Sequence, residues 1–244
     1  MTYIKLEQEK GYILGYALTK EEHSIVVSWI RDLWESRILS CYPELGSTIS
    51  TLALQDYHKL DGQIKHEILW EKKHRIFSKK QANMFQNMSI FSQLQSDLGD
   101  VFIADIEGLG YPELYWRLVR PKPHIDVSEA HADAWFYSIT NNINKERQRR
   151  LCKFWLSIHT TASQSGLSVH AGSHKLDWKY SSEIRHGRPK PIFLDDPNRL
   201  CLQNLPLNNG EGVVFHPQLI HQGIAHHENK TRYSIECALE IADG

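Results

Sequence analysis

The sequence lacks several features that would place a protein in a class at once. Its 244 residues carry a formal net charge of −1, with 28 Lys and Arg against 29 Asp and Glu, so overall charge does not draw it to nucleic acid or to an anionic membrane. No apolar run approaches the ~20 residues of a membrane-spanning helix, and the first ten residues lack the basic-then-apolar pattern of a secretion signal. We therefore expect a cytoplasmic protein with no transmembrane segment and no nucleic-acid partner.

Cysteine is scarce as well. The four cysteines are scattered without a C-x-x-C pair, at Cys41, Cys152, Cys201 and Cys237. Cys152 and Cys237 lie in apolar runs, as small buried hydrophobic residues do. We expect all four to be free thiols in a reducing compartment.

The first hundred residues carry helical signals. Thr19 to Glu22 is a capping box, and the apolar residues after it recur at helical spacing, which predicts a helix over 20–39. A second capping box, Ser78 to Gln81, opens a predicted helix that ends near Gly99. The segment 51–77 is mixed in character and is expected to be helical in part. Residues 1–110 are thus expected to form a mainly helical flank within a single-domain chain.

The period of the apolar residues changes to two from Leu114 onward. Strands are predicted at 114–121, 131–139, 151–160, 167–171, 200–205, from 212 through 221, and 231–241. Turn signals separate several of them, for example at 208–210 and 164–166. About seven short strands at this spacing predict a sandwich, a barrel or a double-sheet jelly roll over 111–244.

A candidate metal site begins in the stretch from Ala130 to Tyr137. His131 and Asp133 stand two residues apart, so on a strand they would leave the same face and could bind one ion together. The best candidate for a third ligand is His221, at the end of an apolar segment that also holds His216 and precedes His226 and His227. Two histidines and one carboxylate with open coordination positions suit a non-haem Fe(II) centre.

Several motifs, taken in order, carry a resemblance to a known family. They are His131-Ala-Asp133, the run from Trp155 to Ile158, His170-Ala-Gly-Ser-His174, Gly210 to Phe215 followed by His221, and Arg232-Tyr-Ser234. Together they resemble the Fe(II)/2-oxoglutarate dioxygenases of the phytanoyl-CoA hydroxylase-like superfamily, over more than half of the chain. The sequence departs from the family at Ala171, where the family's turn usually has Pro. The resemblance implies a mostly β protein with N-terminal helices, whose core is a double-stranded β-helix, a cupin-like jelly roll.

The resemblance also implies roles for individual residues. His131, Asp133 and His221 become the catalytic iron ligands, because the spacing of the family selects His221; His216 is then structural, and His226 and His227 are exposed loop residues. Arg232 is expected to grip the distal carboxylate of 2-oxoglutarate. Ser234 adds a hydroxyl donor on the same strand face, and Trp155 lines the cosubstrate pocket, sharing a predicted inward stripe with Lys153, Ser157 and His159. The implied reaction is a hydroxylation that uses Fe(II), 2-oxoglutarate and O2 and releases succinate and CO2.

Basic residues near the predicted site suggest the charge of the substrate. Arg117 and Arg120 precede the metal-binding segment, and Arg185, His186, Arg188 and Lys190 follow in a predicted loop. Together they could form a cationic mouth for a carboxylate or a phosphate; an ordinary solvated surface is the alternative. Trp135, beside the metal ligands, is a further candidate substrate contact.

The run Tyr115 to Pro121, with His131 to Phe136, resembles a branch of the superfamily that includes the 3-hydroxylase of the acidic sugar Kdo in lipopolysaccharide. That resemblance implies a glycolipid sugar as substrate and a peripheral position on the inner membrane. Two other functions stay open: a small-molecule hydroxylase or desaturase of natural-product metabolism, and a non-catalytic, cupin-like metal-binding jelly roll. The sequence leaves the oligomeric state open.

Overall fold

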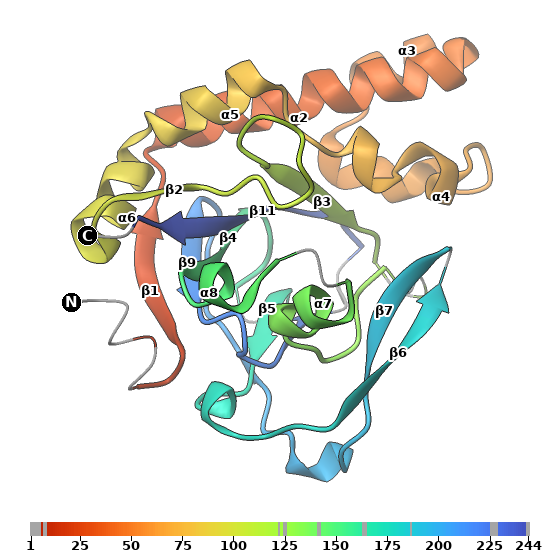
Figure 1. The fold of residues 1–244 in the computed structure, drawn as a ribbon. Coiled ribbons are helices and arrows are strands. Elements are labelled where there is room, and N and C mark those ends of the chain that lie inside the picture. Colours follow the sequence, from red (N-terminus) through yellow and green to blue (C-terminus); the bar gives the residue numbers. More distant parts are fainter. Residues whose placement is uncertain are drawn as a thin grey trace.

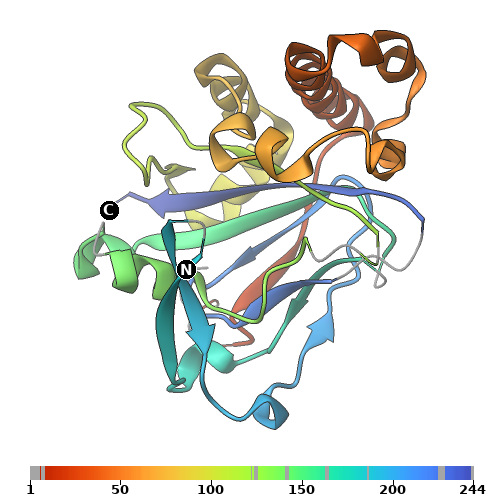
Figure 2. The ribbon, with the colours of Figure 1, turned by 90° about the vertical axis from the view of Figure 1, so that its right-hand side faces the viewer.

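Two facing β-sheets form the body of the protein in the computed structural model, which describes residues 6, 9–121, 123, 126–140, 143–162, 165–185, 187–224 and 229–242. A layer of helices covers the outer face of the larger sheet, and the smaller sheet lies on its opposite face (Figures 1 and 2). This is the double-stranded β-helix that the sequence predicts.

The larger sheet has six strands. In spatial order they are β1 (Tyr12–Ala17), β9 (Glu211–Phe215), β4 (Leu151–His159), β11 (Arg232–Ile241) and β2 (Val101–Ile103), with β3 (Tyr115–Val119) also pairing with β11. All of these pairings are antiparallel. The smaller sheet consists of β10 (His221–Ile224), β5 (Gly166–Val169) and β8 (Gln203–Asn204), and a separate hairpin joins β6 (Tyr180–Arg185) to β7 (Arg188–Phe193).

The helices lie mainly in the first hundred residues. They are α2 (Lys20–Cys41), α3 (Gly46–Thr51), α4 (His66–Leu69), α5 (Lys79–Gln86), α6 (Ser89–Leu98), α7 (Asp133–Thr140) and α8 (Lys145–Gln148), with short 3-10 turns at Pro43–Leu45, Leu54–Leu60, Lys72–His74, Ser173–Lys175 and Pro197–Arg199. Both predicted capping boxes are confirmed, at the start of α2 and of α5. The partly helical character of 51–77 is confirmed too.

Strand alternation divides the side chains of the larger sheet between two cores. On β4, Phe154 and Leu156 face the helical layer and pack with residues such as Trp34 of α2. Trp155, on the opposite face, packs between the two sheets with Val213 and other apolar residues. Because adjacent strands of the larger sheet share this alternation, one face is sealed by helices and the other lines the interior.

The predicted strand 131–139 is wrong. The segment from Asp133 to Thr140 is helix α7, and His131 forms only an isolated bridge with His221. The aromatic residues in this segment fit a strand by propensity, but α7 buries Ala134 and Tyr137 in one apolar cluster and Trp135 in another. Tertiary packing therefore overrides the local preference.

Other predicted boundaries need correction. The helix expected from 79 to 99 is two helices, because Met88 adopts an extended conformation between α5 and α6. The strand expected from 212 through 221 breaks after Phe215, where the backbone N–H of His216 donates to Gly11 O at 2.8 Å. The strand expected at 200–205 is only Gln203–Asn204.

Four of the described strands carried no clear signal in the sequence. They are β1, β2 and the hairpin of β6 and β7, which the sequence reading left within the helical flank or in a loop. β1 joins the larger sheet beside β9, although it precedes the helices in the chain. The helical flank therefore contributes an edge strand to the core sheet.

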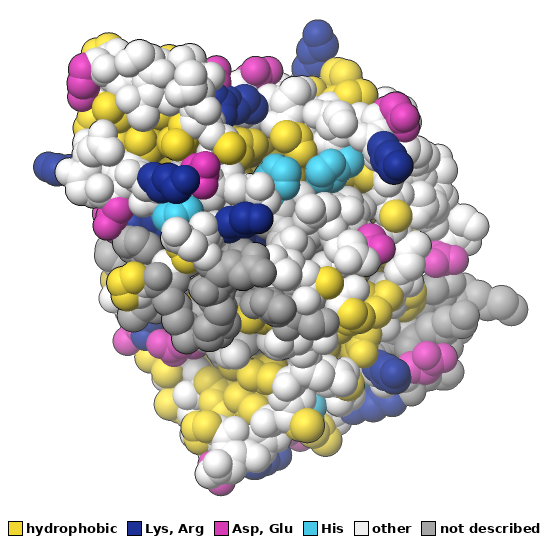
Figure 3. Space-filling model, turned by 180° about the vertical axis from the view of Figure 1, so that it is seen from behind, with side chains coloured by type: hydrophobic (Ala, Val, Ile, Leu, Met, Phe, Trp, Pro, Cys, Tyr) yellow, Lys and Arg dark blue, Asp and Glu magenta, His cyan; other side chains and the backbone are white. Residues whose placement is uncertain are grey.

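The four cysteines are free thiols, and Cys152 and Cys237 are buried. Within the described residues, no helix has the length and apolar character needed to span a membrane. On the face seen in Figure 3, basic and acidic side chains are interspersed with hydrophobic ones, in keeping with the balanced net charge.

Candidate metal and cosubstrate site

Three predicted metal ligands converge in the structure. One ligand atom from each of His131, Asp133 and His221 lies within 4.8 Å of the other two. His221 begins β10, Asp133 begins α7, and His131 lies beside His221 across the isolated bridge, with ring centroids 4.5 Å apart. The structure brings these three residues together, although the strand expected to carry His131 and Asp133 is absent.

Backbone carbonyls orient both imidazole rings. Nδ1 of His131 lies 2.7 Å from Glu129 O, and Nδ1 of His221 lies 3.0 Å from Leu219 O. A carbonyl only accepts, so Nδ1 of each ring is the protonated nitrogen and Nε2 carries the lone pair. Burial lowers the pKa of His131 to about 4, so this ring is neutral and competent to bind a metal at neutral pH.

Asp133 presents one carboxylate oxygen without a partner. Oδ2 is buried, makes no hydrogen bond to the described residues, and lies 3.8 Å from His221 Nε2. Oδ1 lies 3.9 Å from Lys153 Nζ. Burial by itself raises the pKa of Asp133, but Lys153 and the two histidines outweigh burial and lower the pKa below its usual value. A buried, ionised oxygen beside two imidazole nitrogens fits a divalent metal ion, and this donor set suits Fe(II).

Arg232 and Ser234 form a second polar cluster between the sheets. The Arg232 guanidinium is buried, donates to Gly166 O, and lies 5.8 Å from the centre of the Trp155 ring. Its Nε and the buried Ser234 Oγ have no hydrogen-bond partner among the described residues. Burial lowers the pKa of Arg232 to about 9, which still leaves it protonated at neutral pH. Unsatisfied buried donors of this kind fit the carboxylate of a ligand.

Trp155, the third predicted cosubstrate residue, lies at this cluster. It is 4 % exposed and packs in the core between the sheets. His159, expected on the same inward stripe, points the other way. A register shift between Tyr233 and Ser234 rotates the end of β4, and the His159 ring packs against His23 of α2 and against Tyr233.

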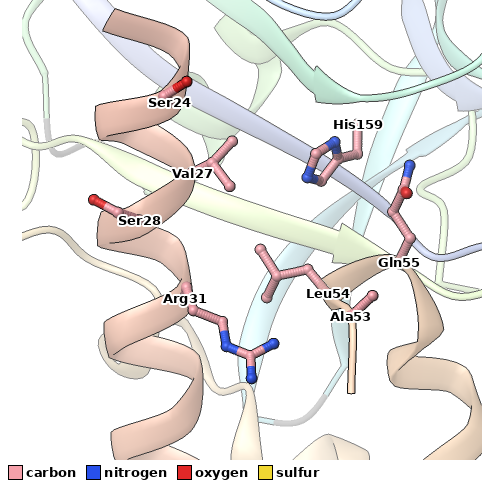
Figure 4. Close-up of a pocket in the computed structure, with 8 residues that line it drawn as sticks. All are labelled: Ser24, Val27, Ser28, Arg31, Ala53, Leu54, Gln55 and His159. Atoms are coloured by element: carbon pink, nitrogen blue, oxygen red, sulfur yellow. The ribbon is translucent and has the colours of Figure 1, made fainter. Parts of the chain in front are cut away.

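His159 lines a hollow on the helical side of the sheet. The hollow has a volume of about 350 Å³ and lies between α2, the segment at Ala53–Gln55 and the end of β4 (Figure 4). Ser24, Ser28 and Arg31 of α2 line its other side. Arg31 donates to the Leu52 and Ile49 carbonyls, so its guanidinium holds neighbouring backbone in place.

Two of the predicted substrate arginines form ion pairs with acidic residues. Arg120 donates through Nε and Nη2 to Asp126, each at 2.9 Å, and so ties down the loop that precedes the metal-binding segment. Arg185 lies 3.4 Å from Glu129 and is half exposed at the tip of β6. His186 lies outside the described residues, as do His226 and His227.

Trp135 has a packing partner. Its ring stacks on Tyr180 of β6, with centroids 4.7 Å apart and an interplanar angle of 8°. Phe193 of β7 packs on the same ring. Trp135 thus attaches the β6–β7 hairpin to α7. The ring of His216 packs beside the ring of His174, with ring centroids 5.2 Å apart.

Arg117 faces the interior and reveals a residue that the sequence analysis missed. Arg117 Nη1 lies 3.6 Å from Glu236 Oε1, and Glu236 faces the space between the two sheets, which we call the chamber. Burial by itself raises the pKa of Glu236, but Arg117 and Lys153 lower it to about 2, so the carboxylate is ionised. The sequence did contain a pattern that could have identified Glu236, because this residue follows Arg232 and Ser234 at the same two-residue spacing on β11.

Known protein folds resemble this one over nearly the whole chain. The non-heme monooxygenase ThoJ in its apo form is 13 % identical, with a TM-score of 0.56 over 98 % of this chain and 77 % of its own. The epimerase SnoN, in complex with Fe3+, alpha ketoglutarate and nogalamycin RO, is 14 % identical, with a TM-score of 0.54 over 99 % and 82 %. EctD from S. alaskensis, in its apoform, is 13 % identical, with a TM-score of 0.53 over 95 % and 73 %. At these identities the likeness shows a shared fold.

Sequence comparison assigns the family. No curated protein sequence matches the chain. The family model described as phytanoyl-CoA dioxygenase (PhyH) matches residues 64–234, which is well over half of the chain and includes the three converging ligands and both residues of the cluster at Arg232. The chain therefore belongs to the phytanoyl-CoA dioxygenase (PhyH) family.

Proposed function

We propose that the protein is an Fe(II)/2-oxoglutarate-dependent oxygenase. The observation that carries this proposal is the His131, Asp133 and His221 cluster, in which all three potential ligand atoms lie within 4.8 Å of each other. The second polar cluster, at Arg232 and Ser234, supports it, because a metal-binding jelly roll without redox chemistry has no need for buried, unsatisfied donors between its sheets. Fe(II) and 2-oxoglutarate bound there would supply the oxidant for O2-dependent hydroxylation.

The protein's own groups would bind and orient the reactants. The carbonyls of Glu129 and Leu219 fix both imidazole rings, so Nε2 of each faces the metal position. Asp133 would offer Oδ2 to the metal, because Oδ1 faces Lys153. Arg232 and Ser234 would hold the distal carboxylate of the cosubstrate. Trp155 and the apolar residues around it limit the access of water.

The test is a spectrum followed by a turnover measurement. Purified protein loaded anaerobically with Fe(II) and 2-oxoglutarate should show the weak visible charge-transfer band of chelated 2-oxoglutarate. His221→Ala should lack the band. Exposure to air should then release succinate, even at the slow rate of an uncoupled reaction. Metal-loaded protein without the band would overturn the proposal in favour of a binding jelly roll.

The substrate is the finer part of the proposal. The residues from Tyr115 to Pro121 favour an acidic sugar such as Kdo, and with it a glycolipid acceptor at a membrane surface. The similar folds, which include a monooxygenase and an epimerase in complex with nogalamycin RO, favour instead a free small molecule of natural-product metabolism. A substrate screen that follows succinate release separates the two, because only a glycan hydroxylase responds to sugar acids and not to free secondary metabolites.

A further inference from the structure

The inward face of β11 carries a line of polar residues that extends beyond the expected cosubstrate. Arg232, Ser234 and Glu236 alternate along this face. At about 3.3 Å per residue, the Cα atoms of Arg232 and Glu236 are roughly 13 Å apart. Glu236 therefore lies well along the chamber from the guanidinium assigned to the cosubstrate.

Two cations flank Glu236 from the neighbouring strands. Arg117 of β3 is paired with Ser234, and Lys153 of β4 is paired with Ala238, so both leave the sheet on the same face as Glu236. We refer to Arg117, Glu236 and Lys153 as the inner charged cluster. Because Lys153 also lies 3.9 Å from Asp133 Oδ1, this cluster adjoins the metal ligands.

The inner charged cluster keeps hydrogen-bonding capacity available. The Arg117–Glu236 and Lys153–Asp133 contacts, at 3.6 and 3.9 Å, are longer than hydrogen bonds. Their side chains are 34 % (Arg117), 22 % (Glu236) and 19 % (Lys153) exposed, so solvent or a ligand can reach them. Partly enclosed charges that are not held by close hydrogen bonds contribute little to stability. Their placement is better explained by a ligand.

The charge of the chamber specifies the sign of that ligand. Around the metal ligands the described inward-facing residues comprise three cations, Arg117, Lys153 and Arg232, and two carboxylates, Asp133 and Glu236. Fe(II) and the dianion of 2-oxoglutarate would cancel each other, and the excess of cations around Glu236 would remain. An anionic group next to Arg117 and Lys153 would neutralise it.

We propose that the inner charged cluster is the substrate subsite and that it takes the anionic group, a carboxylate or a phosphate, of a small organic substrate. This rests on the proposed function, because it places the substrate beside a loaded metal centre. Arg117 and Lys153 would attract the anion, and Glu236 would restrain Arg117 and limit the net positive charge. Arg117 and Lys153 are then specificity-determining residues of the interior, whereas Arg120 and Arg185 remain in their ion pairs.

The experiment uses matched probes that differ mainly in charge. Protein loaded anaerobically with Fe(II) and 2-oxoglutarate is titrated with hexanoate, hexyl phosphate, hexanamide and hexylammonium, and the charge-transfer band reports occupation near the metal. We expect the anions to perturb the band at concentrations about tenfold lower than the neutral and cationic probes. Whichever of hexanoate and hexyl phosphate responds at the lower concentration identifies the anionic group.

Two variants that each remove one charge should move the anion response in opposite directions. Arg117→Met removes a cation and should weaken the anion response by about tenfold, whereas Glu236→Gln removes the competing carboxylate and should strengthen it several-fold. Lys59→Met, an exposed lysine on the segment Leu54–Leu60, is the matched control and should change nothing. If Arg117 and Glu236 had a merely structural role, both substitutions would change the anion response in the same direction.

The outcomes separate the two proposals. If the charge-transfer band never forms, the proposed function fails. If the band forms but the anionic, neutral and cationic probes perturb it equally, or do not perturb it at all, the subsite proposal alone is overturned. Equal anion responses in wild type, Arg117→Met and Glu236→Gln would overturn it as well. The band in each variant also verifies that the variant has folded with an intact metal site.

Discussion

The backbones of His131 and His221 hydrogen-bond to each other in both directions, with N···O distances of 3.0 Å from His131 N and 2.9 Å from His221 N. These two bonds fix the separation of two residues that stand ninety positions apart in the chain. The two imidazoles therefore keep their relative position through the backbone, and not only through a bound metal. Such preorganisation lowers the cost of forming a metal site.

Removing either of these histidines should abolish iron binding. His131→Ala and His221→Ala each delete one ligand from a set of three, so we expect no measurable Fe(II) after dialysis and no succinate formation. His216→Ala is the matched control, because His216 packs against His174 and accepts from Gln218 N without reaching the cluster. It should retain a measurable fraction of both signals. If His216→Ala is as damaging as His221→Ala, the choice of the distal ligand is wrong.

Arg232 should dominate the affinity for 2-oxoglutarate. Arg232→Met removes a charged donor from a buried site, and hydrogen bonds to charged groups contribute roughly 1.5–3 kcal/mol, so affinity should fall by about 10- to 100-fold. Ser234→Ala removes one neutral donor and should cost less. The measurement is titration of 2-oxoglutarate into Fe(II)-loaded protein under nitrogen, with Fe(II) affinity measured in parallel. Loss of iron together with 2-oxoglutarate would point to a folding defect instead.

The residues of the site were easier to predict than the elements that carry them. His131 and Asp133 lie close together although the strand predicted for them is absent, since Asp133 begins helix α7 and His131 precedes it. The two-residue spacing argument assumed a strand, whereas the resemblance selected the same residues from the order of the motifs. The pairing of His131 with His221 could not be predicted, since no local pattern specifies which distant segments form a bridge. β1 was missed for the same reason: six residues before a long helix gave no sign that they pair with β9.

The interior of the chamber was only partly predicted. The two-residue rule was applied to Arg232 and Ser234, and one further step along β11 reaches Glu236. Arg120 was predicted as a substrate contact because of its charge and its position before the metal-binding segment. In the structure it donates instead to Asp126, six residues later in the chain. Which arginines face inward depends on strand register, and register is a tertiary property.

The stack of Trp135 on Tyr180 should stabilise the β6–β7 hairpin. Tyr180→Ala removes one face of the stack without changing α7, and a double-mutant cycle with Trp135→Phe should give a coupling free energy of about 1 kcal/mol in urea unfolding. The hairpin of Tyr180→Ala should also be cleaved faster by protease, whereas the charge-transfer band should persist. If Tyr180→Ala eliminates the band, the hairpin contributes directly to the metal site, contrary to a packing role.

Acid should destabilise the fold between about pH 6.5 and pH 4. Burial lowers the pKa of His66, His159 and His216 to about 4 each, against 6.5 for an unperturbed histidine. Between these values the unfolded chain binds protons that the folded chain does not, so stability is greatest above pH 6.5 and falls as the pH drops toward 4. Urea unfolding of metal-free protein in chelator, at pH 7 and pH 5, measures the loss without any contribution from the metal. His66→Gln, which can keep a hydrogen bond to Tyr57, should reduce the difference between the two pH values. An unfolding free energy that is the same at pH 7 and pH 5 would show that these rings titrate freely in the folded protein.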